Sequence, residues 1–226
     1  MKYKYVFFDR DGVLTRSKPE TEAWKKAEIE GWSGREYRMD YDRMMRLFTA
    51  AGYPKTGLKS VEEEITFWLR YWVCLLREEG VTDLPEEKAW ILHRGTWLRG
   101  HMLWPDTIDA LEYFRNHGYR MGVISDTSPS LELTLRAVGI ADYFESFTCS
   151  SLVGAMKPDE RIYRAALHTL GAAEEESLYV DDYEPEADGA RALGLTAFHL
   201  VRSGPCTSRW DIPGLQSMVD YAERNG

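Results

Sequence analysis

The chain has 226 residues, of which 44% are hydrophobic and 13% aromatic, so it can form a globular core and is not disordered. Acidic residues outnumber basic residues by 37 to 28, which argues against a nucleic-acid partner, because no basic excess exists to neutralise phosphates. The longest apolar stretch, residues 66–76, is interrupted by Arg70 and is too short to cross a bilayer, so we expect no membrane partner. Three cysteines without a CxxC pair predict a reducing compartment, the cytoplasm.

The first predicted element is a strand at residues 3–8, which is apolar on both sides and runs directly into Asp9 and Asp11. Two carboxylates this close repel each other, and burying them is costly unless something positive lies between them. The pair therefore predicts a bound cation, a special hydrogen-bond network or a catalytic role.

Residues 16–102 are predicted to form an all-helical domain that interrupts the fold after this first strand. Helices are expected at residues 19–30 and 40–51, and apolar residues recur at helical spacing from Val61 until Gly80 ends the pattern. Seven of the eight tryptophans lie here or at the exit from this domain, and we expect Trp68 and Trp72 to fill its core. Other residues lie nearer the exit and could contact a substrate: Arg94, Trp97, Arg99, His101 and Trp104.

From residue 103 onward, predicted strands alternate with predicted helices. The strands are expected at residues 120–125, 145–148, 177–180 and 196–200, and the helices at residues 130–137, 159–170 and 186–193. Such alternation is typical of a parallel sheet with crossover helices. We therefore predict an α/β fold: residues 1–15 and 103–226 form a Rossmann-like parallel sheet with helices on both faces, and residues 16–102 form the helical domain.

Four polar motifs follow predicted strands or lie between them. They are Asp9-x-Asp11-Gly12, Ser125-Asp126-Thr127, Lys157-Pro158 and Asp181-Asp182. Each motif alone is typical of a turn, a helix cap or a solvated loop. Ligands of open parallel sheets bind beyond the carboxyl ends of the strands, so together these side chains should converge. Carboxylates suit Mg²⁺, a carboxylate can attack phosphorus, and a lysine and a serine can hold phosphoryl oxygens.

The four motifs resemble those of the haloacid dehalogenase (HAD) superfamily, in the same order: "FFDRDGVLT", "VISDT", "MKPDERIY" and "YVDDYEPEADGA". The helical insertion is similar to the family's C1 cap. The resemblance implies that Asp9 is the nucleophile and that Asp11 protonates the leaving group and then activates water. It implies that Ser125 and Lys157 bind the phosphoryl group. It also implies that Asp9, the Asp11 main-chain carbonyl and Asp182 hold Mg²⁺.

Further candidates follow from the same resemblance. Gly12 and Asp126 are expected in the substrate site, and Asp181 and Glu186 are additional candidate metal ligands. Asp126 stands where many relatives carry asparagine; its carboxylate would repel phosphate, so we expect its backbone to face the site. Asp181 replaces a frequent glycine, and its position in the motif favours Asp182 as the metal ligand.

The resemblance implies a Mg²⁺-dependent phosphatase acting on a small phosphorylated metabolite through an aspartyl-phosphate, as a monomer or a homodimer. A phosphomutase of the same fold and a non-catalytic binding or regulatory protein remain alternatives. A dehalogenase is disfavoured, because that chemistry does not call for Asp11, and a phosphonatase is disfavoured for the same reason. We expect the helical domain to close over the site as a cap, hinged near residues 16–18 and 100–105.

Overall fold

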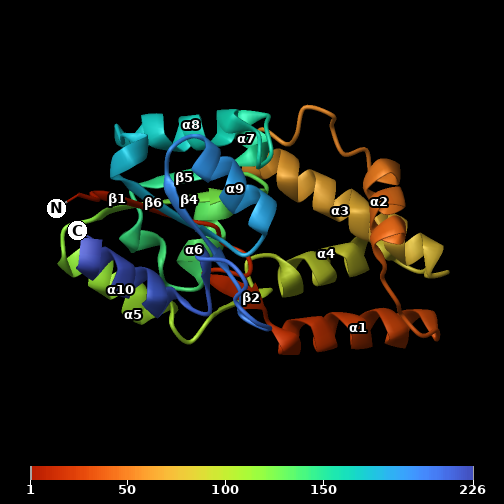
Figure 1. Ribbon diagram of the computed structural model, residues 1–226. Coiled ribbons are helices and arrows are strands. Elements are labelled where there is room, and N and C mark those ends of the chain that lie inside the picture. Colours follow the sequence, from red (N-terminus) through yellow and green to blue (C-terminus); the bar gives the residue numbers. More distant parts are fainter. Residues whose placement is uncertain (1, 226) are drawn as a thin grey trace. The chain divides into compact units, whose positions relative to one another are not determined.

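The computed structural model describes residues 2–225, which form two compact units (Figure 1). The α/β unit comprises the residues up to Arg16, Met102–Thr127 and the residues from Leu131 onward. The helical unit comprises Ser17–His101 together with Ser128–Ser130. The domain limits expected from the sequence differ by one residue from those of the two units, at residue 16 and at residue 102. Residues 128–130 were expected in the α/β domain but group with the helical unit.

The α/β unit is built on a parallel sheet, which confirms the predicted fold class. Within residues 2–225 the sheet has six strands in the order β5-β4-β1-β6-β7-β8. The strands are β1 (Tyr5–Phe8), β4 (Arg120–Ser125), β5 (Ser146–Cys149), β6 (Ser177–Asp181), β7 (Thr196–Leu200) and β8 (Asp211–Ile212). Phe8, the last residue of β1, pairs with Val123 on one side and Val180 on the other, so the central strands end close together.

Helices cover both faces of this sheet because its strands are apolar on both sides. Val6 and Phe8 of β1 pack with α5 (Thr107–Asn116), α6 (Leu131–Ala137) and α10 (Leu215–Asn225). Phe7 points the other way and packs with α8 (Glu160–Leu170) and α9 (Glu184–Ala192). Short helical turns complete the unit: η1 (Ala141–Tyr143), α7 (Ser150–Val153) and η2 (Glu174–Glu176).

The helical unit contains α1 (Pro19–Ser33), α2 (Tyr41–Ala50), α3 (Val61–Glu78) and α4 (Pro85–Thr96). Helix α3 begins at a true cap, because the Ser60 side chain accepts a hydrogen bond from the Glu63 N–H. Its apolar face carries Trp68 and Trp72 into the core of the unit, as the sequence predicted. Within residues 2–225, no helix is long and apolar enough to cross a membrane.

The boundary between the two units runs through a small sheet of β2 (Thr15–Ser17) and β3 (His101–Leu103). The sequence predicts an all-helical domain between residues 16 and 102, and that prediction is wrong at these two ends. Each strand is three residues long, too short to produce a recognisable alternation of apolar and polar residues.

Candidate functional site

The predicted site residues meet at the carboxyl ends of the central strands. Asp9 follows β1, Ser125 ends β4 and Asp181 ends β6. The chain order reverses around β1, with β4 and β5 on one side and β6, β7 and β8 on the other, and ligands bind at such a switch point. A cavity of about 260 Å³ lies there, lined by Asp9, Asp11, Gly12, Ser125, Asp126, Lys157, Asp181, Asp182, Tyr183 and Glu186. The structure therefore brings together the catalytic, substrate-binding and metal-ligating candidates that the four motifs supply.

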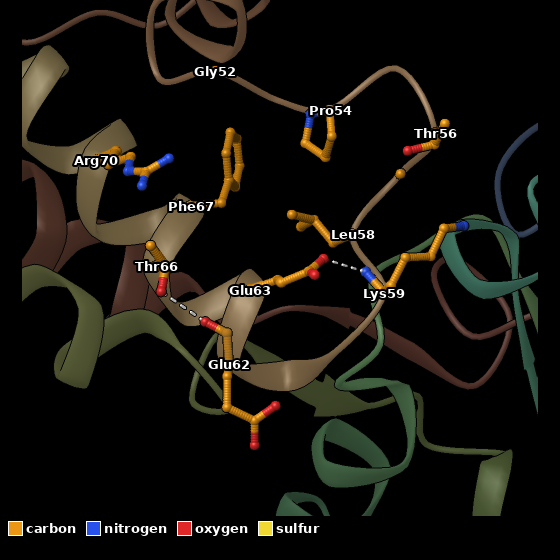
Figure 2. A pocket seen from close by; sticks show the side chains of 11 residues that line it. Gly52, Pro54, Thr56, Leu58, Lys59, Glu62, Glu63, Thr66, Phe67 and Arg70 are labelled. Carbon is orange, nitrogen blue, oxygen red and sulfur yellow. Dashed lines mark hydrogen bonds between the residues drawn. The ribbon is translucent and has the colours of Figure 1, made fainter.

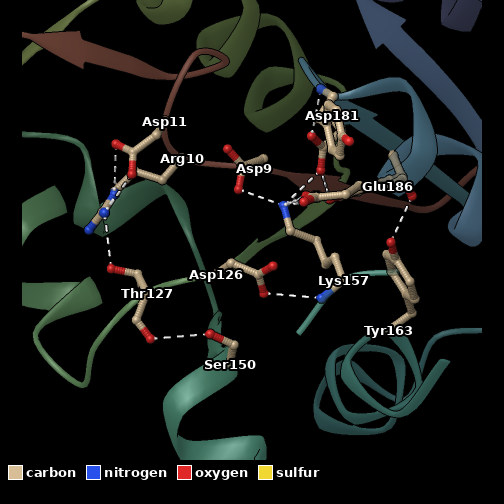
Figure 3. Close-up of polar contacts among 12 residues, drawn as sticks. Asp9, Arg10, Asp11, Asp126, Thr127, Ser150, Lys157, Tyr163, Asp181 and Glu186 are labelled. Carbon is tan, nitrogen blue, oxygen red and sulfur yellow. Dashed lines mark hydrogen bonds and ion pairs between the residues drawn. The ribbon is translucent and has the colours of Figure 1, made fainter. Parts of the chain in front are cut away.

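Lys157 is the centre of the polar contacts in this cavity (Figure 3). Its ammonium Nζ lies 2.8 Å from Asp9 Oδ1, 2.7 Å from Asp181 Oδ2 and 2.7 Å from Glu186 Oε2. The side chains of Lys157 and Asp181 are 2% exposed and that of Asp9 is 8% exposed. Charges buried this deeply must be paired, so Lys157 holds Asp9 in one orientation at the end of β1.

The electrostatics of this cluster favour an additional cation. Burial raises the pKa of Asp9 to about 8, and the charge of Asp181 adds to the rise although Lys157 opposes it. Burial likewise raises the pKa of Glu186 to about 7. Burial alone would lower the pKa of Lys157, but the surrounding carboxylates outweigh it and raise that pKa, so the lysine remains an ammonium. With a pKa of about 8, Asp9 is largely protonated near neutral pH, and a divalent cation would favour its ionised form and that of Glu186.

The two acids at the end of β6 have different surroundings. Asp181 is buried, and its oxygens accept hydrogen bonds from Lys157 Nζ, the Tyr179 hydroxyl and the Tyr183 N–H. Asp182 is exposed as a residue, but partial desolvation of its carboxylate, together with the charge of Asp181, raises its pKa. The structure thus commits Asp181 to Lys157 and leaves Asp182 facing the cavity.

Gly12 is required by the packing of Asp182 against the turn that follows β1. Its φ is +79°, and a Cβ atom at this position would lie 1.9 Å from Asp182 Oδ2. The Gly12 N–H is donated to the Thr15 carbonyl at 2.8 Å, so this glycine supplies space for a carboxylate and uses its own amide in the turn. Asp9 and Asp182 therefore present hard oxygen donors beside the same turn, and this donor set fits Mg²⁺.

Ser125 and Asp126 lie on the opposite side of the cavity from β6. Ser125 is buried, with 1% of its surface exposed. The Asp126 carboxylate accepts a hydrogen bond of 3.1 Å from the Lys157 N–H, and burial raises its pKa. Asp126 thus uses its carboxylate to fix the backbone that carries Lys157.

Several residues of the site were not found from the sequence. Arg10 contacts Asp11, and the Tyr179 hydroxyl reaches both Lys157 and Asp181. Arg202 donates hydrogen bonds to the carbonyls of Gly12 and Val13, so it braces the turn after β1 from a distant part of the chain. Only Arg10 left a signal in the sequence, since it stands between the two acids of the first motif.

A second group of potential metal ligands lies within the α/β unit. The donor atoms of Glu184, His199 and Asp211 lie within 4.8 Å of one another. The Asp211 carboxylate, however, already accepts hydrogen bonds from the backbone of Thr207 and Ser208 and contacts His199. Asp211 therefore orders the loop that leads into β8.

The helical unit has a cavity of its own, about 510 Å³ in volume, between the chain at Gly52–Lys59 and the first half of α3 (Figure 2). Its lining balances the two signs of charge, with Lys59 and Arg70 against Glu62 and Glu63, so it lacks the excess of carboxylates found in the first cavity.

The candidate substrate residues of the helical unit do not line this cavity. Arg94 and Arg99 are exposed, and His101 is half-buried. The Trp97 ring stacks on His93 with a centroid separation of 5.0 Å. Trp104 lies in the α/β unit, and its Nε1 donates to the Thr15 carbonyl at 3.1 Å. Both tryptophans thus have structural partners within their own units.

Comparisons with known proteins agree with the motifs. A model of haloacid dehalogenase-like hydrolases matches residues 3–194, and the chain belongs to this hydrolase family. A phosphatase of Mycobacterium tuberculosis is 27% identical over 90% of each chain. The phosphoserine phosphatase of Thermus thermophilus is 28% identical over 88% of this chain and 89% of that protein. The structure of a 2-haloacid dehalogenase from Pseudomonas syringae shares the fold, with a TM-score of 0.71 and 19% identity over 99% of this chain and 100% of that one.

Proposed function

We propose that this protein is a Mg²⁺-dependent phosphatase that hydrolyses a small phosphorylated metabolite through an aspartyl-phosphate on Asp9. The observation that supports this most strongly is the buried Asp9–Lys157 pair, 2.8 Å apart, with Asp11 in the same cavity. The acidic surplus of the chain supports a partner other than nucleic acid, and its short apolar stretches support a partner other than a membrane. Three cysteines without a CxxC pair support a cytoplasmic location. We propose a monomer or a homodimer.

In the first step, a carboxylate oxygen of Asp9 attacks phosphorus, and the bond from phosphorus to the leaving oxygen breaks. Asp11 gives its proton to that oxygen, so the product leaves as an alcohol. Lys157 orients Asp9 for the attack and offsets the repulsion between the carboxylate and the phosphoryl group. Ser125 donates to a phosphoryl oxygen from the end of β4.

In the second step, water attacks the phosphorus of the aspartyl-phosphate. Asp11, now ionised, takes the proton of that water, inorganic phosphate leaves, and the Asp9 carboxylate is restored. Asp9, Asp182 and the main-chain carbonyl of Asp11 would hold the Mg²⁺ ion. When bound, the ion supplies positive charge for the phosphoryl oxygens.

Asp11 is the residue that favours phosphate transfer over dehalogenation, because displacement of halide needs no proton donor at this position. We further propose that the helical unit acts as a cap that supplies substrate contacts beyond the phosphate. We propose that Arg99, just before β3, and His101, the first residue of β3, determine which substrates the protein prefers.

The test is phosphate release from a panel of phosphorylated metabolites, with Mg²⁺ and with excess EDTA. We expect turnover with Mg²⁺ and none after chelation. Full activity in EDTA would contradict the metal assignment. Release of halide from 2-chloropropionate without any phosphatase activity would contradict the proposed function, and transfer of the phosphoryl group to another hydroxyl of the substrate would identify a mutase.

A further inference from the structure

Arg10 is a buried cation placed between the two acids of the first motif. It follows Asp9 directly, and its side chain is 8% exposed. The Asp11 side chain beside it is 54% exposed. Burying a guanidinium is costly, and an ion pair with a half-exposed carboxylate returns little stability. Stability therefore does not explain why an arginine is buried here.

The contact between Arg10 and Asp11 is a two-point fork. Arg10 Nε lies 3.1 Å from Asp11 Oδ1, and Nη2 lies 2.6 Å from Asp11 Oδ2. The Thr15 hydroxyl lies a further 3.2 Å from Oδ1. Two parallel hydrogen bonds fix the plane of a carboxylate, which a lysine ammonium cannot do because it acts as a point charge.

Two threonine hydroxyls hold the guanidinium on the side away from Asp11. Nη1 donates to the Thr134 hydroxyl in α6 at 3.1 Å, and Nη2 donates to the Thr127 hydroxyl at 3.0 Å. Arg10 is thus held by groups from three segments of the α/β unit. Figure 3 shows the result: Asp11 is turned toward Arg10, which also reaches Thr127, while Asp9 is turned toward Lys157.

We propose that Arg10 is a positioning residue for Asp11, which it holds in a defined orientation for proton transfer to the leaving group. This inference rests on the proposed phosphatase function. The guanidinium does not contact the substrate in this scheme, because four of its five N–H donors are committed to Asp11, Thr127 and Thr134. Its effect should therefore depend on how much protonation the leaving group needs.

The experiment compares kcat/KM on p-nitrophenyl phosphate and phenyl phosphate, which have similar shapes but differ in how readily the phenol leaves unprotonated. General acid catalysis contributes about 10²–10⁴ in rate, so we expect Arg10→Met to lower kcat/KM on phenyl phosphate by about 100-fold. On p-nitrophenyl phosphate we expect a loss of less than about tenfold. Arg136→Met, at an exposed arginine that pairs with Glu132 on α6, should change neither value.

Arg10→Lys separates geometry from charge, because it keeps the cation and removes the fork. Positioning by the fork predicts that Arg10→Lys behaves like Arg10→Met, whereas full activity in Arg10→Lys would overturn the proposal. An equal loss on both esters would also overturn it, since that is the result of a purely structural role. If Arg10→Met fails to fold, Arg10→Lys and Thr134→Val, which removes one brace, carry the same test.

Asp11→Asn keeps a failure of this proposal distinct from a failure of the proposed function. If Asp11→Asn shows the larger loss on phenyl phosphate and Arg10→Met does not, Asp11 is the acid and the role of Arg10 is wrong. If the wild-type protein releases phosphate from neither ester, the phosphatase function fails, and the role of Arg10 fails with it.

Discussion

Asp9 in the α/β unit and Glu64 in the helical unit are buried in opposite ways. In the α/β unit, the carboxyl groups of Asp9 and Asp181 are buried together around one ammonium, that of Lys157. In the helical unit, Glu64 is 3% exposed, and its carboxylate accepts hydrogen bonds from neutral donors, the Ser130 N–H at 2.8 Å and the Ser130 hydroxyl at 2.7 Å. The first arrangement costs stability and is typical of a catalytic site. The second gives a buried carboxylate its hydrogen bonds and is typical of a structural role.

The core of the helical unit combines aliphatic side chains with a cluster of aromatic rings. The Phe48 ring lies 5.0 Å from Phe67, 5.7 Å from Trp68 and 5.6 Å from Tyr71, measured between ring centroids, in edge-to-face arrangements. Such a core depends on shape and apolar area. Substitutions at the site in the α/β unit should therefore lower turnover, whereas substitutions in the core of the helical unit should lower stability. This difference can be tested.

The largest effect is expected from Asp9→Asn. The amide keeps the shape of the side chain but is a poor nucleophile, so kcat should fall by several orders of magnitude. The substitution also removes one carboxylate from a crowded cluster, so the melting temperature should stay the same or rise. Phosphate release and thermal unfolding measure the two effects, and retention of about a tenth of the rate, only about 1.4 kcal/mol of barrier, would contradict the role of Asp9.

Leu75→Ala should show the opposite behaviour. Leu75 is fully buried in the core of the helical unit, and removing such a side chain costs about 2–5 kcal/mol of unfolding free energy. Urea unfolding would measure the loss, with Leu69→Ala, a partly exposed leucine on the same helix, as the matched control. At a temperature where the variant is folded, kcat on p-nitrophenyl phosphate should be unchanged; a loss of stability no larger than that of the control would contradict the assigned core.

The sequence predicted the sheet and the meeting of the four motifs because both follow from local patterns. Strand β4 occupies the predicted residues 120–125, since a buried parallel strand is apolar on both faces. Asp9 and Lys157 lie 148 residues apart and meet because their motifs follow neighbouring parts of one sheet. The sequence therefore predicts where the site lies, but not which side chains contact one another there.

What escaped prediction depends on contacts between distant residues or on weak patterns. Strand β8 has two residues, and α4 begins at Pro85 with a run of charged residues, so neither shows a clear period. The hydroxyl of Tyr179 is hidden in an apolar strand, and only the fold shows that it reaches Lys157. The same holds for residues 128–130, whose grouping with the helical unit follows from the hydrogen bonds of Ser130 to Glu64.

A smaller effect is expected at Glu64. Glu64→Leu should lower the unfolding free energy by about 1–3 kcal/mol, because it leaves the buried Ser130 N–H without an acceptor. Glu64→Gln keeps one acceptor oxygen and should cost less. Urea unfolding of both variants and of Ser130→Ala measures the difference. Equal stability of Glu64→Leu and the wild-type protein would show that this carboxylate does not hold the segment.

The smallest effect concerns pH. His93 is 3% exposed in the helical unit, and burial lowers its pKa below the ordinary value of about 6.5. The unfolded chain then binds a proton that the folded protein does not, so this histidine makes unfolding easier as the pH falls below about 6.5. We expect the unfolding free energy to be lower at pH 5 than at pH 8, and His93→Gln to reduce that difference. His168→Gln, at an exposed histidine on α8, should keep the pH dependence of the wild-type protein. Because the His93 ring stacks on Trp97, tryptophan fluorescence reports the unfolding of this unit directly, and an unchanged pH dependence in His93→Gln would show that His93 does not control it.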